Sequence, residues 1–139
     1  MTLAICVLLG RAIACPIFYK IFLEGLRRIN KLSIITKTND LLDELYDAIA
    51  QYPKSEKFAL GADTKQAGLN FYRLIITAAK KYYKKTTLKD ADVELFVLKN
   101  FIRMAHSRKY MNTKRYERLS RAVEEVGRML GGWIQSTDK

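Results

Sequence analysis

Apolar residues spaced three or four positions apart recur along most of this sequence, and this spacing constrains its fold more than any other feature. An α-helix has 3.6 residues per turn, so residues at this spacing share one face. The clearest series lies near the C-terminal end and consists of Tyr116, Leu119, Val123, Val126, Leu130 and Trp133. The chain of 139 residues contains only two prolines and seven glycines, which favours helices over strands.

From Ser33 onward, four segments carry this periodicity and are predicted as helices. They run from about 33 to 52, from a start between 55 and 63 to about 83, from about 91 to 106, and from about 113 to 134. We expect Pro53 to end the first helix, Asp90 to cap the third, and Asn112 or Thr113 to cap the fourth. The short connections and the absence of a strand pattern predict an all-α fold, an antiparallel up-down-up-down four-helix bundle over residues 33–139.

Residues 1–32 do not follow this pattern. They are mostly apolar and are interrupted by Arg11, Pro16, Lys20 and Glu24. No basic residue precedes the apolar run, unlike in a signal peptide, and Arg11 and Lys20 leave it too short to span a bilayer. We expect an apolar N-terminal extension, loosely ordered or packed as an added helix. A membrane-associated helix and a segment added by an upstream start codon are the alternatives.

The predicted third helix is apolar on two sides. Val93, Val97, Phe101 and Met104 form one side, and the other side consists of Leu95, Leu98, Ile102 and Ala105. A small bundle buries only one face of each helix. The second apolar side therefore suggests a contact with another subunit.

The chain is strongly basic, with a formal net charge of +11 at pH 7 and a pI of about 9.7. Residues 73–115 hold twelve lysines and arginines against three acidic residues, whereas the acidic residues cluster on the first helix. Phosphate backbones are the usual partners of such a surface. An anionic membrane surface, or a lysine-rich surface without a partner, is the alternative.

The candidate nucleic-acid-binding residues lie on the second and third helices and the start of the fourth. They are Arg73, Lys80, Lys84, Lys99, Arg103, Arg108, Arg115 and Arg118. Four tyrosines are interleaved with them and are candidates for stacking on unpaired bases, the alternative being half-buried edges of the core: Tyr72, Tyr82, Tyr83 and Tyr110.

The sequence offers little for catalysis. His106 is the only histidine and has no cysteine nearby, so we expect a surface or helix-end residue and neither a metal site nor a cofactor. No nucleophile, phosphate-loop or dinucleotide motif is present, and we expect no enzymatic activity. Cys6 and Cys15 are the only cysteines and match no zinc or redox motif. A chain without a disulfide framework is typical of a reducing compartment, so we expect a cytoplasmic protein.

The stretch VGRMLGGWI, residues 126–134, places three glycines in a predicted helix. Gly127 and Gly131 are four residues apart and share a face, so we expect a neighbouring backbone to approach closely there. Gly131→Leu would then overfill the contact. Gly132 is a candidate for the C-terminal cap, with Trp133 covering the end of the bundle.

The segment EEVGRMLGGWIQS, residues 124–136, resembles the C-terminal signature of the accessory variability determinant (Avd) proteins of diversity-generating retroelements. Its matching positions include Gly127, Arg128, Gly131 and Trp133. The segments KTNDLLDEL and YPKSEKFALG also resemble the family's first helix and following turn. The resemblance extends over about Ser33 to Ser136 and leaves out the apolar extension.

The resemblance implies a non-catalytic, basic four-helix bundle that assembles as a barrel-shaped homopentamer. It implies binding to the element's reverse transcriptase and to template-repeat RNA, or an RNA/DNA hybrid, in support of the mutagenic copying of that RNA into cDNA (mutagenic retrohoming). The family's functional basic residues fall on Lys99 and Arg103. Lys99 stands where an arginine is expected, a change that keeps a phosphate contact but weakens a bidentate one.

Two alternatives to this resemblance stay open. One is the related group of four-helix bundle proteins encoded by intervening sequences of 23S ribosomal RNA. The other is a membrane-surface protein anchored by residues 1–32.

Overall fold

A computed structural model describes residues 14–138, and the chain divides into two compact units, Met1–Leu32 and Ser33–Lys139. Helix α2 (Ala14–Ala50) contributes residues 14–32 to the first unit and residues 33–50 to the second. The expectations for Cys6 and Arg11 lie outside the described residues. No helix among residues 14–138 combines the length and the apolar character needed to cross a membrane.

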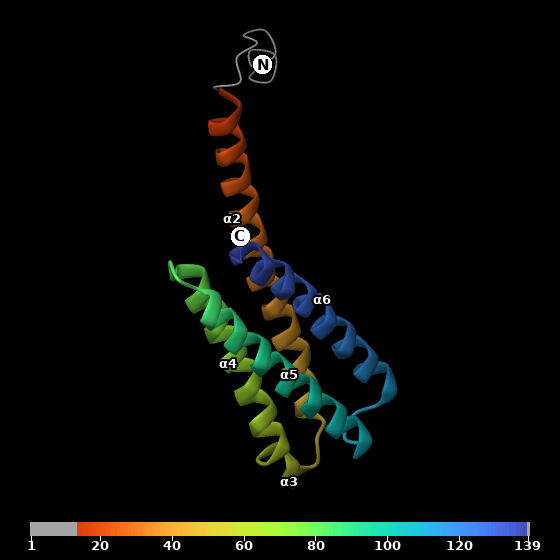
Figure 1. Ribbon diagram of the computed structural model, residues 1–139. Coiled ribbons are helices and arrows are strands. Elements are labelled where there is room, and N and C mark those ends of the chain that lie inside the picture. The colour runs from red at the N-terminus through yellow and green to blue at the C-terminus, as the bar shows by residue number, and fades with distance from the viewer. Residues whose placement is uncertain (1–13, 139) are drawn as a thin grey trace. The chain divides into compact units, whose positions relative to one another are not determined.

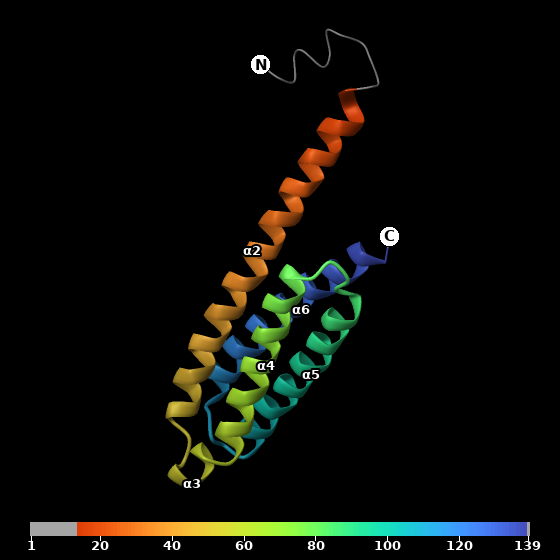
Figure 2. The ribbon, with the colours of Figure 1, turned by 90° about the vertical axis from the view of Figure 1, so that its left-hand side faces the viewer.

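The second unit is an all-α bundle, as predicted, and no strand occurs among the described residues. After the last part of α2 come the short helix α3 (Lys54–Lys57) and the helices α4 (Leu60–Lys80), α5 (Lys85–Ser107) and α6 (Thr113–Thr137). Within this unit the long helices alternate in direction, so that the α4–α5 turn and the α3 and α5–α6 turns lie at opposite ends (Figures 1 and 2). We refer to residues 33–138 as the bundle.

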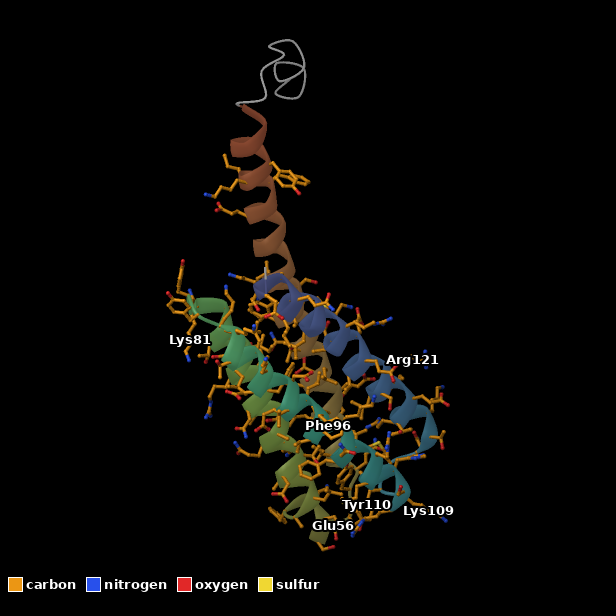
Figure 3. The ribbon with its side chains drawn as sticks, viewed as in Figure 1. Glu56, Lys81, Phe96, Lys109, Tyr110 and Arg121 are labelled. Carbon is orange, nitrogen blue, oxygen red and sulfur yellow. The ribbon has the colours of Figure 1, made fainter. Side chains whose placement is uncertain are left out.

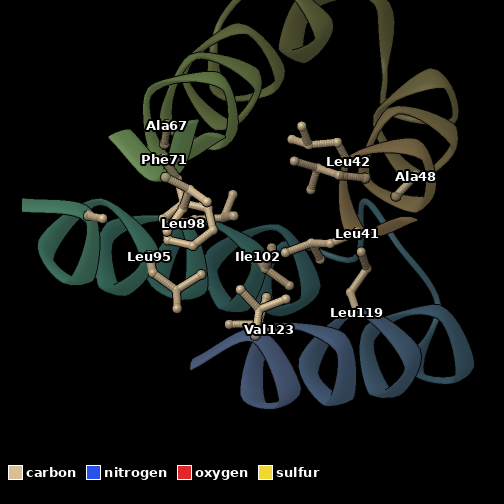
Figure 4. Packing of buried hydrophobic residues seen from close by; sticks show 14 of the residues in the cluster. Leu41, Leu42, Ala48, Ala67, Phe71, Leu95, Leu98, Ile102, Leu119 and Val123 are labelled. Carbon is tan, nitrogen blue, oxygen red and sulfur yellow. The ribbon is translucent and has the colours of Figure 1, made fainter. Parts of the chain in front are cut away.

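The apolar stripes of the four long helices meet in one core (Figure 4). Leu41, Phe71, Leu98 and Leu119, one from each of these helices, are at most 1% exposed. The cost of ordering these side chains is offset by the removal of their apolar surface from water. The stripe predicted for the fourth helix is confirmed, since Leu119, Val123, Val126 and Leu130 are all buried.

The predicted helix ends are partly wrong. The segment between Pro53 and Tyr83 forms two helices, and α4 ends at Lys80, which leaves Tyr82 and Tyr83 in a turn. Helix α5 begins at Lys85, so Asp90 lies inside the helix and does not cap it. The earlier start buries Thr87 and Leu88, which are 6% and 0% exposed, against the bundle.

The turn between α5 and α6 is built by two local devices. Lys109 adopts a left-handed conformation with φ of 61°, and the next amide, of Tyr110, donates to the carbonyl oxygen of Ala105. This arrangement satisfies carbonyls at the end of a helix. Asn112 then caps α6, as predicted, because its Oδ1 accepts a hydrogen bond of 2.8 Å from the amide of Arg115.

The close contact expected at the C-terminal glycines is wrong for the bundle as a single chain. A Cβ atom at Gly127 would lie 3.5 Å from Leu95 Cδ2, an ordinary contact, and one at Gly131 would meet nothing within 4 Å. Gly132 does not begin a cap, since α6 continues to Thr137. The glycines that allow close approach are Gly61 and Gly68 of α4, where a Cβ would lie 2.9 Å from Ile49 Cγ2 and Leu42 Cδ2 of α2, respectively.

Candidate nucleic-acid interface

The outer side of α4 carries a polar ridge that ends in basic residues. Gln66 Nε2 donates to Asn70 Oδ1 at 2.8 Å, and one turn further the hydroxyl of Thr77 donates to the carbonyl of Arg73 at 2.7 Å. The side chains of Arg73 and Lys80 are exposed. The ridge therefore presents its charge to solvent at the end of α4 that leads into the α4–α5 turn.

A groove of about 450 Å³ lies between α5 and α6 and holds the two basic residues predicted for the third helix. Its lining consists of Lys99, Arg103, Tyr116, Glu117, Ser120, Arg121 and Glu124. Lys99 Nζ lies 3.8 Å from Glu124 Oε1, and both side chains are about half exposed, so the pair is weak. Arg103 is exposed and makes no ion pair within residues 14–138.

The groove adds one cation that the predicted set of binding residues did not contain. Arg121, labelled in Figure 3, lines the groove together with Arg103. Its Nε donates a long hydrogen bond of 3.4 Å to the carbonyl of Glu117. Helical spacing alone puts Arg121 away from the apolar stripe of α6. It does not show which helix lies beside Arg121, because that depends on how α6 is rotated against α5.

Arg115 and Arg118 face a different side of the bundle. Arg115 Nη1 donates to the carbonyl oxygen of Asp47 at 2.8 Å, and Arg118 Nε lies 3.1 Å from Glu44 Oε1. Lys37 and Glu125 form a third link between α2 and α6 at 3.1 Å. Arg118 thus pairs with an acidic side chain of α2 and Arg115 with its backbone, so both arginines join α2 to α6 rather than line the α5–α6 groove.

The other two candidates lie at the two ends of α5. Arg108 is exposed at the C-terminal cap, beside Lys109. Lys84 precedes the first residue of the helix and is partly buried. The eight candidates are therefore divided among the α4 ridge, the α5–α6 groove, the two ends of α5 and the α2–α6 contact.

His106 lies in the last turn of α5 and is engaged with α6. Its ring stacks on that of Tyr116 with centroids 4.3 Å apart and an interplanar angle of 11°. Its Nε2 lies 3.3 Å from the hydroxyl of Thr113. Within residues 14–138, no three histidine, cysteine, aspartate or glutamate side chains gather as metal ligands.

The four candidate tyrosines divide into two pairs. Tyr72 and Tyr110 pack against the core, and the ring of Tyr110 lies 5.7 Å from that of the buried Tyr52. Tyr82 and Tyr83, in contrast, are 86% and 87% exposed. Only the second pair leaves both rings open to solvent.

A comparison with protein families matches residues 32–137 to the family described as bAvd-like. The chain belongs to the bAvd-like family. The match extends over the bundle, includes the segment EEVGRMLGGWIQS and confirms the resemblance found in the sequence. A comparison with curated proteins gives no match.

The bAvd-like bundle exposes only part of the second apolar side predicted for its third helix, because Val97 and Phe101 of that side are partly buried against the core. Leu95, Leu98, Ile102 and Ala105 are buried in the core, at most 5% exposed. Val93 and Met104 of the second side are 61% and 42% exposed, and Phe96, which the prediction did not include, is 67% exposed. Leu69 and Ile76 of the neighbouring α4 are each 39% exposed. We call these five residues the α4–α5 apolar surface.

The segment that resembles the C-terminal Avd signature occupies the last turns of α6. Trp133 is partly buried and packs against the core, together with Met129 and Ile134. Arg128 is exposed, and Gly131 has open space around it. Within a single chain the signature therefore combines an aromatic residue packed on the core with an outward face of small and basic residues.

Proposed function

We propose that this bAvd-like protein is a non-catalytic accessory protein of a diversity-generating retroelement. It binds the element's reverse transcriptase and template-repeat RNA and supports the synthesis of mutagenic cDNA in the cytoplasm, without a cofactor. Family membership over residues 32–137 supports the proposal.

The observation that carries the RNA-binding part is the α5–α6 groove. Arg103 and Arg121 lie beside Lys99 in a groove open to solvent, and Arg103 makes no ion pair within the described part of the chain. An unpaired guanidinium offers several donors to phosphate oxygens in a fixed plane. The exposed Arg73 and Lys80 of α4 supply a second basic surface for a polyanion.

We further propose that the chain assembles as a homopentamer through the α4–α5 apolar surface. Large apolar side chains exposed along neighbouring helices are characteristic of protein contacts. Val93 and Phe96 are more than 60% exposed although they lie in the middle of a stable helix. A second copy of the chain removes them from water.

A pull-down of the full chain tests the proposal. Its probes are the reverse transcriptase encoded beside it and the template-repeat RNA, each at a low and a high salt concentration. We expect both to co-purify, with RNA binding that falls steeply as salt rises, because each phosphate contact releases a counterion. An absence of binding at low salt would reject the proposal.

Two double variants with the same change in net charge compare the groove with another part of the surface. Lys99→Glu with Arg103→Glu reverses two charges in the groove, and Lys54→Glu with Lys57→Glu reverses two on α3, outside the candidate residues. We expect only the first pair to weaken RNA and reverse-transcriptase binding, with both variants folded. Equal binding by the two variants would count against the groove.

A further inference from the structure

We propose that Tyr82 and Tyr83 form a stacking platform for unpaired bases of a single-stranded RNA. The inference rests on the proposed RNA-binding function and names a second contact, away from the α5–α6 groove. The platform lies in the α4–α5 turn, residues 81–84, at the end of the bundle opposite α3 (Figures 1 and 2).

The two rings are held in a defined arrangement while they remain open to solvent. Their centroids are 4.9 Å apart with an interplanar angle of 88°, an edge-to-face pair. Such a pair is mutually attractive, so the rings fix one another's orientation. Because both side chains are more than 85% exposed, this pairing leaves ring surface free for a third aromatic group.

The fold does not require aromatic residues at these positions. Neither tyrosine belongs to the core, and the turn ends α4 through its own backbone, since the amide of Lys81 donates to the carbonyl of Thr77 at 3.0 Å. Exposing two large rings to water is unfavourable, and a partner that covers them would gain free energy from the burial of their apolar surface. Their presence in a turn therefore indicates contact with a partner.

The charge around the rings indicates that this partner is a polyanion. Every residue from 80 to 85 is a lysine or a tyrosine, in the sequence KKYYKK. Lys81 Nζ lies 3.3 Å from the hydroxyl of Thr87, and Lys85 forms an ion pair of 2.5 Å with Asp138 (Figure 3 labels Lys81). Lys80 is exposed at the end of the α4 ridge. Two aromatic rings flanked by lysines suit a single nucleic-acid strand, because its bases can stack on the rings while its phosphates contact the lysines.

A single strand fits this surface better than a duplex or a membrane. Bases in a duplex are stacked on one another and offer no free face, whereas an unpaired base does. A segment that lies on a membrane buries a broad apolar face of Trp, Phe or Leu at the acyl boundary, and residues 80–87 contain none of these three residue types.

The test measures the Kd of the full chain for two oligonucleotides of equal length, an oligouridine and its abasic counterpart, by fluorescence anisotropy. Both carry the same phosphates, but only the first carries bases. We expect the wild-type chain to prefer the oligouridine. Tyr82→Ala with Tyr83→Ala should weaken oligouridine binding about tenfold and leave abasic binding unchanged, because stacking on an aromatic ring is lost.

Two control variants separate stacking from other effects. Tyr82→Phe with Tyr83→Phe keeps the rings and should retain the preference for the oligouridine. Phe58→Ala removes a ring that is 87% exposed at the other end of α4, about 30 Å away by the rise of a 21-residue helix, and should change nothing. Circular dichroism confirms that each variant remains helical.

The outcomes distinguish this inference from the proposed function. A wild-type chain that bound neither oligonucleotide would overturn both. An alanine double variant with an unchanged preference for the oligouridine would overturn the platform alone. Alanine variants that lost binding to vesicles of phosphatidylserine, but kept their affinity for oligouridine, would overturn the platform in favour of a membrane contact.

Discussion

Lys99 Nζ lies 3.8 Å from Glu124 Oε1 across the groove between α5 and α6. In this position the carboxylate competes with any phosphate for the same cation. We predict that Glu124→Gln tightens RNA binding a few-fold at low salt, whereas Arg103→Gln weakens it and lowers the salt dependence by roughly one counterion. Affinity measured as a function of salt checks both. Identical salt slopes for wild type and Arg103→Gln would show that phosphate does not contact Arg103.

Arg115 joins α6 to α2 through the carbonyl of Asp47, so its substitution should act on stability. We expect Arg115→Gln to lower the free energy of unfolding by about 1 kcal/mol, since a charge-assisted hydrogen bond is lost. RNA affinity should change less than in Arg103→Gln. Urea unfolding and anisotropy on the same samples separate the two effects. A stable variant with weak RNA binding would place Arg115 in the interface.

The α4–α5 apolar surface predicts an effect on assembly without an effect on the fold. Phe96 is 67% exposed, so Phe96→Asp leaves the core intact but places a charge where a second copy would bury an aromatic ring. We expect the variant to elute as a helical monomer at concentrations where the wild-type chain is oligomeric. Light scattering after gel filtration measures the mass. A variant with the wild-type mass would assign the contact to another surface.

Two glycines should respond in opposite directions to alanine. At Gly131 a Cβ meets open space, so Gly131→Ala should stabilise the bundle by about 0.5–1 kcal/mol through helix propensity. At Gly61 the Cβ would lie 2.9 Å from Ile49 Cγ2 and 3.1 Å from the carbonyl oxygen of Glu56. Gly61→Ala should therefore destabilise by about 1–3 kcal/mol. Thermal unfolding compares the two, and a lower Tm for Gly131→Ala would indicate a neighbour from another subunit.

Tyr52 gives the bundle a pH dependence in the alkaline range. Burial raises the pKa of Tyr52 from 10.0 to about 12, and its hydroxyl has no hydrogen-bond partner within the described residues. The folded chain holds the proton more tightly than the unfolded chain. Its contribution to stability is therefore complete below pH 10 and decreases as the pH rises toward 12.

Tyr52→Phe removes this titration and a buried, unsatisfied hydroxyl. We expect the variant to be more stable than wild type by roughly 1 kcal/mol at neutral pH. The difference should widen above pH 10, where lysine titration affects both chains alike. Urea unfolding at neutral pH and near pH 11 gives the comparison. A constant difference between the two chains would rule out the titration of Tyr52.

The periodicity of the apolar residues was sufficient to predict the number of long helices in the bundle and most of the residues in its core. Leu119, Val123, Val126 and Leu130 lie at steps that only a helix brings to one face, and Asn112 is a strong capping residue. The start of α5 was missed because Lys85, Thr86 and Thr87 look like a polar turn. Burial of Leu88 against the other helices overrides that local signal.

The candidate site was less predictable, because it depends on the rotation of each helix against its neighbours. Arg118 and Arg121 are three residues apart on α6, yet one pairs with Glu44 of α2 and the other lines the α5–α6 groove. Tyr72 and Tyr82 were both stacking candidates within the predicted second helix, which was expected to run to about residue 83. The end of α4 at Lys80 decides between them, because Tyr72 lies inside the helix next to buried Phe71 and Tyr82 lies beyond it.

The glycines of α6 also set where the bundle opens locally. Gly127, Gly131 and Gly132 fall within six residues, and each lowers helix stability by about 0.5–1 kcal/mol relative to alanine. Beyond them, the end of the helix is tied to the start of α5 by the exposed ion pair of Asp138 with Lys85. We expect amide hydrogens near the end of α6 to exchange with solvent when this end of the helix unfolds locally. Those around Leu119 should exchange only when the whole bundle unfolds. We therefore expect the segment that resembles the family's C-terminal signature to lie in the part of the last helix that opens first.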